Sequence, residues 1–240
     1  MNLSHVERYF SDFLSAMESD EEIPLYKLPQ DSGENVELFE EIPERIQLPR
    51  NLFVTGTVNI DETTYMFSPK VLDRSNVVEF KPEKDDVLAL MVGGDDVSDI
   101  KPAGFGIAED FKKLAVKIRN GVCGVDVDDL ERVKSFLDDI YMDLQESGFE
   151  FAYRTVKEIR QYFAASYELE KDDFDLTKIM DEQIVQKILP KIYGDRKQIG
   201  ELLDKLEEKC YEGMGAPDIE MTLSLKKIAQ MKKQPCGDQL

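Results

Sequence analysis

Residues 52–80 read LFVTGTVNIDETTYMFSPKVLDRSNVVEF, and the interpretation of the whole chain depends on this stretch. It opens with an apolar run, Leu52–Val54, that is typical of a β-strand and leads through small residues to Asn59. A Ser-Pro pair then favours a short helical turn that ends at Arg74. A second β-prone run, Val77–Phe80, follows. The stretch therefore predicts a strand, a polar tip, a short helix and a second strand.

This order resembles the second half of an AAA+ nucleotide-hydrolysing module, and in detail that of McrB-like restriction NTPases. A strand of that family ends in G-T-x-N, which Gly56, Thr57 and Asn59 match. The resemblance implies that Asn59 is sensor 1, in contact with the γ-phosphate or the attacking water. It implies that Arg74 is an arginine finger acting in trans, alone because Asp73 replaces the first of the usual paired arginines. An Asn after a strand and an Arg after a helix also occur in other α/β proteins.

The N-terminal residues carry a further resemblance. An S-x-x-E capping box at Ser4–Glu7 predicts a helix whose apolar stripe reaches Met17. Met1 and Asn2 resemble the M-N that follows the Walker B acids in McrB-like proteins, so Asn2 is implied as a nucleotide-binding residue. No G-x-x-x-x-G-K-[ST] loop occurs in the 240 residues. The resemblance implies a portion that begins after the Walker B acids, and the alternative is a naturally short protein.

Composition divides the chain into two predicted domains. Residues 19–49 mix acids with turn residues and predict a β-rich insertion. Residues 81–109 are rich in glycine, proline and acids, which predicts a hinge. From Ile107 onward, apolar residues recur at helical spacing. We therefore predict an α/β domain at 1–100 and a helical lid domain at 101–240.

Two segments of the helical part resemble McrB-like lids. Tyr153–Ile159 matches Y-R-x-x-x-E-I, which implies that Arg154 is the sensor 2 residue that reaches the γ-phosphate. Arginine suits this role because its planar fork holds phosphate oxygens in pairs. The alternative is a surface arginine at a helix N-terminus. Residues 186–196, QKILPKIYGDR, and the S-x-x-K-I-x-x-M of Ser224–Met231 match two further segments of these lids.

Charge and residue usage exclude several classes of function. The chain has 30 basic and 50 acidic residues and a net charge of −20, which opposes nonspecific attraction to nucleic acid or anionic membrane. Cys123, Cys210 and Cys236 are far apart and His5 is the single histidine, so no metal site or disulfide framework is predicted. No apolar run is long enough to cross a bilayer, and we predict a cytoplasmic protein.

The predicted fold class is α/β: a partial AAA+ P-loop NTPase core, with the sensor 1 strand (52–58) and the last strand (76–80) only, followed by an all-α lid. The implied function is the C-terminal portion of an ATPase or GTPase of a DNA restriction or defence system. The complete module would bind ATP or GTP with Mg²⁺, form a ring with other AAA+ subunits and act with a nuclease subunit, whereas this chain alone would bind no nucleotide and be inactive. Alternatives are an interaction protein that supplies Arg74 to such a ring, and an acidic helical scaffold for basic proteins.

Overall fold

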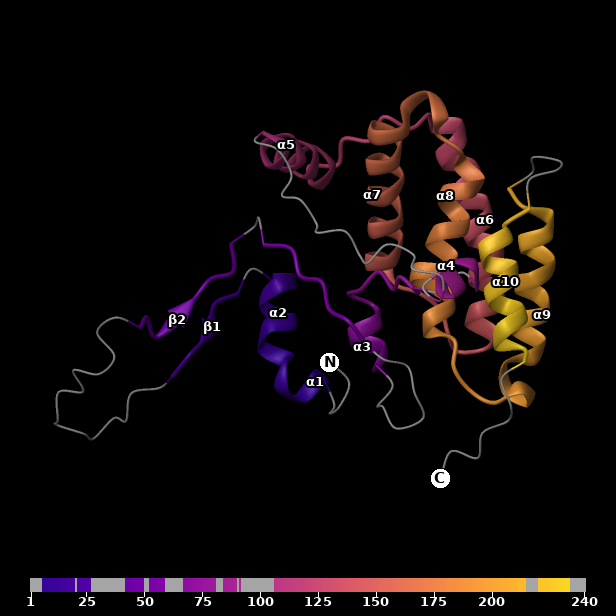
Figure 1. Ribbon diagram of the computed structural model, residues 1–240, viewed down its shortest axis with the longest axis horizontal. Helices are drawn as coiled ribbons and strands as arrows, with labels where there is room; N and C mark the ends of the chain where they lie inside the picture. Colours follow the sequence, from indigo (N-terminus) through magenta and orange to yellow (C-terminus); the bar gives the residue numbers. More distant parts are fainter. Residues whose placement is uncertain are drawn as a thin grey trace. The chain divides into compact units, whose positions relative to one another are not determined.

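The protein is described here from a computed structural model (Figure 1). The structure describes residues 6–19, 21–26, 42–49, 52–58, 67–80, 84–89, 91, 106–214 and 220–233. The chain forms two compact units, Met1–Arg74 and Ser75–Leu240. The predicted domain boundary near residue 100 lies outside the described residues and stays a prediction.

The first unit is built from short elements. Its helices are α1 (Val6–Tyr9), α2 (Ser11–Ser19) and α3 (Pro69–Leu72), and β1 (Ile23–Pro24) pairs antiparallel with β2 (Arg45–Ile46). The single N-terminal helix predicted from the apolar stripe is therefore interrupted at Phe10. Leu14 of α2 and Val71 of α3 form a small buried cluster, against which Phe10 and Phe67 pack. Helix α3 starts as the Ser-Pro pair predicted, with Pro69 at its first position.

The predicted α/β class is wrong, because the protein is mostly helical and the described residues contain only a two-stranded sheet. Residues 52–58 and 76–80, predicted as the sensor 1 strand and the last strand, belong to no ladder. A strand is stable only when neighbours satisfy its backbone groups and cover its apolar side chains. Here Leu52, Phe53 and Val54 are exposed, and so are Val78 and Phe80. The described residues therefore show no AAA+ α/β core. The β-rich insertion predicted at 19–49 is represented by β1 and β2, and most of the rest of it is not described.

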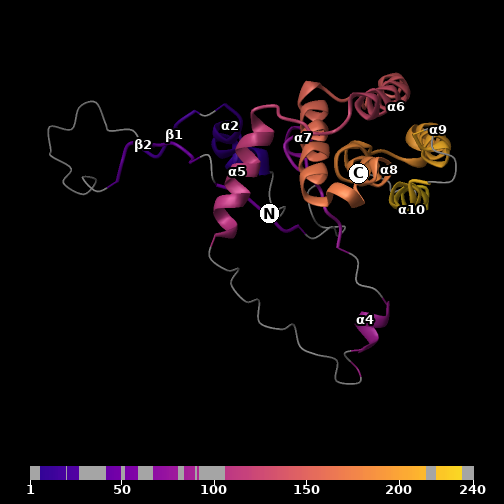
Figure 2. The ribbon, with the colours of Figure 1, turned by 90° about the horizontal axis from the view of Figure 1, so that it is seen from above.

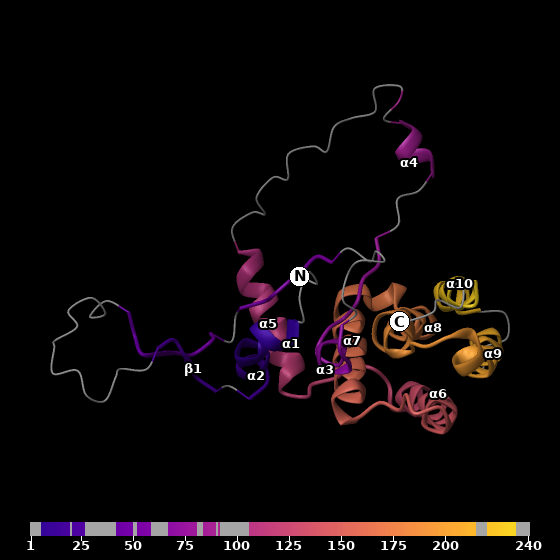
Figure 3. The same cartoon turned by 90° about the horizontal axis from the view of Figure 1, so that it is seen from below.

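The second unit is helical. Its elements are α4 (Lys84–Ala89), α5 (Ile107–Arg119), α6 (Val127–Glu146), α7 (Tyr153–Glu170), η3 (Lys171–Asp173), α8 (Leu176–Gln183), the π-helical turn η4 (Ile184–Ile188), η5 (Leu189–Lys191), α9 (Arg196–Glu212) and α10 (Thr222–Met231). Helix α9 lies beside both α6 and α10, as Figures 2 and 3 show from opposite sides. Helix α7 contacts α5 and α8. No helix among the described residues is long and apolar enough to cross a membrane.

Helix α6 begins and ends where its local sequence predicts. Asp126 caps α6, and its side chain accepts a hydrogen bond of 2.8 Å from the amide of Asp128. Gly148, with φ of 75°, follows the C-cap of α6 in the left-handed conformation that glycine adopts without strain. One face of each long helix then enters a shared core. Its fully buried members include Ile140, Leu144, Ile159, Phe163, Met180, Leu203 and Ile228.

Gly124, in the connection between α5 and α6, has no room for a side chain. A Cβ at this position would lie 2.7 Å from the ring of Tyr167, which itself packs edge-on against Phe174. We therefore expect Gly124→Ala to lower the free energy of unfolding by about 1–3 kcal/mol through overpacking. Urea unfolding followed by circular dichroism measures this.

Gly200→Ala is the matched control for this experiment. Gly200 lies inside α9, and the nearest atom to a Cβ there is 3.9 Å away. Because alanine is the better helix former, this substitution should raise the free energy of unfolding by about 0.5–1 kcal/mol. Equal effects of the two variants would contradict the close contact at Gly124.

Candidate functional site

The structure describes two of the predicted site residues. Asn2 and Asn59 lie outside the described residues, so their predicted roles stay predictions. Arg74 ends the first unit, and Arg154 lies in the second. Their surroundings differ strongly in exposure and in charge.

Arg74 follows the short helix α3, and its side chain is largely buried. Only 16% of the side chain is exposed, and Nη2 forms an ion pair with Glu18 of α2. Nε and Nη1 are buried and have no hydrogen-bond partner among the residues that the structure describes. The guanidinium is thus held within the first unit by Glu18. Two of its nitrogens, Nε and Nη1, have no acceptor among the described residues.

Arg154 lies in the first turn of α7 and is half-buried. The preceding Tyr153 is 95% exposed. Ala152, the N-cap residue, provides no side-chain cap, and the first turn carries no acidic residue. A helix N-terminus presents backbone N–H groups and a partial positive charge, which attract anions. The position of Arg154 is therefore suited to contact with a phosphate.

Two lysines of the segment 186–196 hold the first turns of α7 in place. Lys187 is 1% exposed; its Nζ forms an ion pair with Glu158 and donates a 2.9 Å hydrogen bond to the carbonyl oxygen of Ser75. Lys191 Nζ donates a 2.9 Å hydrogen bond to Oγ1 of the buried Thr155. Both contacts lie just after Arg154 in the sequence, since Thr155 follows it directly and Glu158 lies one turn further along α7.

The two lid segments singled out in the sequence therefore meet in space. This contact was not predicted from the sequence, although the sequence carries a signal for it. Lys187 and Lys191 are four residues apart in an otherwise apolar run, and a charge in such a run needs a partner. Thr155 and Glu158 offer oxygen atoms three residues apart on one face of α7.

Lys187 belongs to an unusual helical turn. The π-helix η4 widens the backbone at Ile184–Ile188, and the carbonyl oxygen of Gln186 accepts a 3.1 Å hydrogen bond from the amide of Val77. Lys227 of α10 also contacts the extended segment 75–80, through a 2.7 Å ion pair with Glu79. Residues 75–80 are thus attached to the helices of this unit at three points.

The motif residues of α10 have a structural role. Asp181 of α8 is buried and accepts hydrogen bonds from the amides of Leu223 and Ser224, at 2.8 and 2.7 Å, and from the Ser224 hydroxyl. The carboxylate satisfies the first N–H groups of α10 from a distant part of the chain, as an N-cap residue does locally. The similarity of Ser224–Met231 to McrB-like lids therefore coincides with a packing contact between α8 and α10.

Nucleophilic and metal chemistry find little support in the described residues. They contain no group of three or more potential metal ligands. Burial raises the pKa of the Cys210 thiol to about 12, and burial together with a hydrogen bond to Glu182 raises the pKa of Tyr162 to about 12. Both groups stay protonated at neutral pH, so neither is an activated nucleophile.

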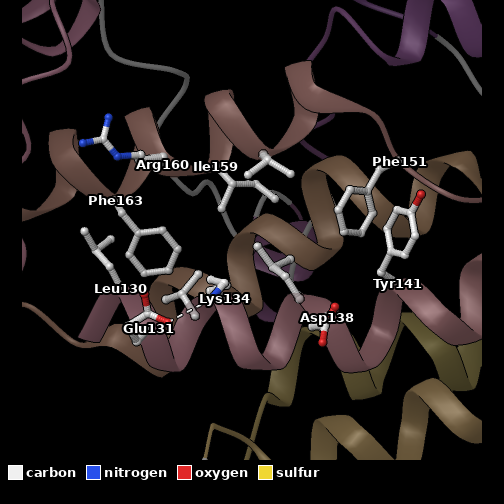
Figure 4. Close-up of a pocket in the computed structure, with 12 residues that line it drawn as sticks. Leu130, Glu131, Lys134, Asp138, Tyr141, Phe151, Ile159, Arg160 and Phe163 are labelled. Atoms are coloured by element: carbon white, nitrogen blue, oxygen red, sulfur yellow. Dashed lines mark hydrogen bonds and ion pairs between the residues drawn. The ribbon is translucent and has the colours of Figure 1, made fainter. Parts of the chain in front are cut away.

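An apolar groove of about 370 Å³ lies between α6 and α7 (Figure 4). Phe163 of α7 lies beside Leu130 of α6 at one end of the groove. At the other end, the rings of Phe151 and Tyr141 pack edge to face with centroids 5.2 Å apart. Charged residues of the two helices, Glu131, Lys134, Asp138 and Arg160, also line it. The groove is a surface feature separate from the Lys187 contacts.

The comparisons with known proteins identify one family. The model of a domain of unknown function (DUF8727) matches residues 100–236, more than half of the chain and nearly all of the described helical part. No curated protein and no solved structure matches the chain.

The Lys187 contacts predict a large effect of one substitution. Lys187→Met removes a buried cation and leaves Glu158 and the Ser75 carbonyl without their partner. We expect the free energy of unfolding to fall by about 2–3 kcal/mol, as measured by urea unfolding. Lys178→Met is the control, because the Lys178 side chain is 56% exposed and lies 3.7 Å from Glu170. That variant should change stability by less than about 0.5 kcal/mol. Similar losses in both would disprove the special role of Lys187.

Proposed function

The chain belongs to the DUF8727 family, and we propose that it is the sensor and lid portion of a McrB-like AAA+ ATPase or GTPase. The observation that carries the proposal is the contact between the two segments that resemble McrB-like lids. Tyr153–Ile159 and residues 186–196 are distant in sequence, yet Lys187 joins Glu158 and Lys191 joins Thr155. Both segments resemble the same family, and they also contact each other in the fold. This supports descent from that family better than two unconnected matches would.

The surroundings of Arg154 support its proposed role as sensor 2. It lies at a helix N-terminus without a side-chain cap, on a helix that two lysines fix in place. Its guanidinium would bind γ-phosphate oxygens of ATP or GTP. Phosphoryl transfer depends mainly on a P-loop, a metal ion and acids that hold the metal. These 240 residues contain no P-loop motif, and the described residues do not fit a Mg²⁺ site. We therefore propose that this chain does not hydrolyse nucleotides alone.

The proposed partners follow from the same assignment. Other AAA+ subunits in a ring would bind the nucleotide that Arg74 contacts as an arginine finger. The energy of nucleotide hydrolysis would drive a nuclease subunit of a restriction or defence system. The net charge of −20 argues against direct nucleic acid binding by this chain. A cytoplasmic location is part of the proposal. The second candidate is an interaction protein that joins such a ring without hydrolysing nucleotide, and it is favoured by the lack of a P-loop motif in these 240 residues.

The decisive experiment begins with the DNA upstream of codon 1. The proposal predicts an in-frame continuation that encodes G-x-x-x-x-G-K-[ST] and then Asp-Glu. The complete protein should hydrolyse ATP or GTP, and Arg154→Ala should lower its kcat by about 10²-fold or more, because one positioned donor to transition-state charge is lost. Arg160→Ala, the same change six residues further along α7, is the control and should leave kcat unchanged.

Three outcomes would count against the proposal. One is an unrelated upstream sequence with its own promoter. Another is hydrolysis by the 240-residue chain alone. The last is a complete protein in which Arg154→Ala and Arg160→Ala have the same kcat.

A further inference from the structure

Helix α5 is amphipathic but contains no fully buried residue. Its apolar residues recur at helical spacing and form one stripe, which consists of Ile107, Phe111, Leu114 and Ile118. Ile107 is 58% exposed, and Leu114 and Ile118 are only half-buried, although α5 contacts α7. Most of the stability of a short helix comes from burial of such a stripe. The apolar face of α5 is therefore suited to a further partner.

The groove between α6 and α7 matches this stripe in length and in character (Figure 4). Along α6 the groove extends from Leu130 to Tyr141, and the stripe of α5 extends from Ile107 to Ile118. The two ends are eleven positions apart in both cases, which is about three helical turns. The groove has a volume of about 370 Å³, and its buried apolar residues include Val133, Leu137, Ile159 and Phe163. An apolar groove with charges along its rim receives the apolar face of an amphipathic helix.

The charges of α5 and α6 are complementary. Helix α5 has four basic and two acidic residues, whereas α6 has seven acidic and two basic residues. Asp138 is exposed at the rim of the groove and forms no ion pair with the residues that the structure describes. The same holds for Lys112 and Arg119, which lie about two turns apart on one side of α5. Copies of a chain with a net charge of −20 repel each other, so a contact between them needs such local complementarity.

We propose that the groove between α6 and α7 is the docking site for α5 of a second copy of this chain. The apolar stripe of α5 fills the groove, and the basic residues beside the stripe face Asp138. Each copy carries both the helix and the groove, so two copies related by a two-fold axis make the contact twice. Both parts lie within residues 100–236, which match the family model. This inference does not depend on the proposed nucleotide chemistry.

The first test measures self-association of the 240-residue chain by sedimentation equilibrium. The wild-type chain should form a dimer. Ile107→Glu on α5 and Val156→Glu in the groove should each raise the Kd of the dimer by roughly 10-fold or more, because each places a charge in an apolar contact. Val116→Glu and Leu169→Glu are the controls. They introduce the same charge at exposed positions of α5 and α7 outside the contact, and should leave the Kd unchanged.

Asp138→Lys tests the charge contact against the effect of net charge. The substitution makes the chain less negative, which by itself reduces repulsion between copies. The proposed contact predicts the opposite, a Kd raised by roughly 10-fold, because the lysine faces the basic side of α5. Asp139→Lys makes the same change at an exposed neighbour that does not line the groove, and should not raise the Kd. Equal constants for the two variants would contradict the charge contact that this docking requires.

The second test uses fluorescence, since the chain contains no tryptophan. Ile107→Trp places a single tryptophan on the apolar face of α5. Its emission should shift to shorter wavelength as the protein concentration rises through the Kd, because the indole enters the groove of the second copy. Addition of Val156→Glu should abolish this shift. A shift that is independent of concentration would place α5 in the groove of its own chain and overturn the proposal.

Two further results would overturn the inference. One is a chain that stays monomeric at every concentration. The other is a dimer whose Kd is unaffected by both Ile107→Glu and Val156→Glu. Circular dichroism checks that each variant keeps its helices, so that loss of the fold is not mistaken for loss of association. Neither test involves nucleotide hydrolysis, and the proposed function is therefore tested separately.

Discussion

The ammonium group of Lys187 is buried among helices and can remain there only because oxygen atoms accept its N–H groups. An isolated buried charge is far more costly than a neutral polar group, so its position constrains whatever surrounds it. Glu158 of α7 and the carbonyl of Ser75 meet this requirement. The widened turn η4 provides a further backbone contact, from Gln186 to Val77. The ammonium group of Lys187 thereby joins α7 and the extended segment 75–80 to η4.

This arrangement gives Arg154 a firm support without burying it. Helix α7 is fixed near its start by Lys187 and Lys191, and its apolar face packs into the core through Ile159 and Phe163. Arg74 has a different support, a small cluster around Leu14 and Val71 with one carboxylate beside it. The two arginines singled out by resemblance are thus held by unlike means.

Much of the helical unit could be predicted from the sequence because its signals are local. The apolar stripe of α6, its cap at Asp126 and its stop at Gly148 all act within a turn or two of the chain. The strands could not be predicted in the same way. Leu52–Val54 has the residue types of a buried strand. A strand also needs a second strand beside it, and these three residues are exposed in the structure. The α/β class was wrong for this reason, and Asn59, at the end of the predicted strand, is not described.

The sequence by itself determined where α6 begins and ends and which faces of the long helices are apolar, because capping and periodicity involve residues close together in the chain. It also pointed to Arg74 and Arg154 through motif resemblance. Only the tertiary structure decided the partners of the buried charges: Lys187 with Glu158, Asp181 with the start of α10, and Arg74 with Glu18. These partners are distant in sequence. They are brought together by core packing, which no local pattern records.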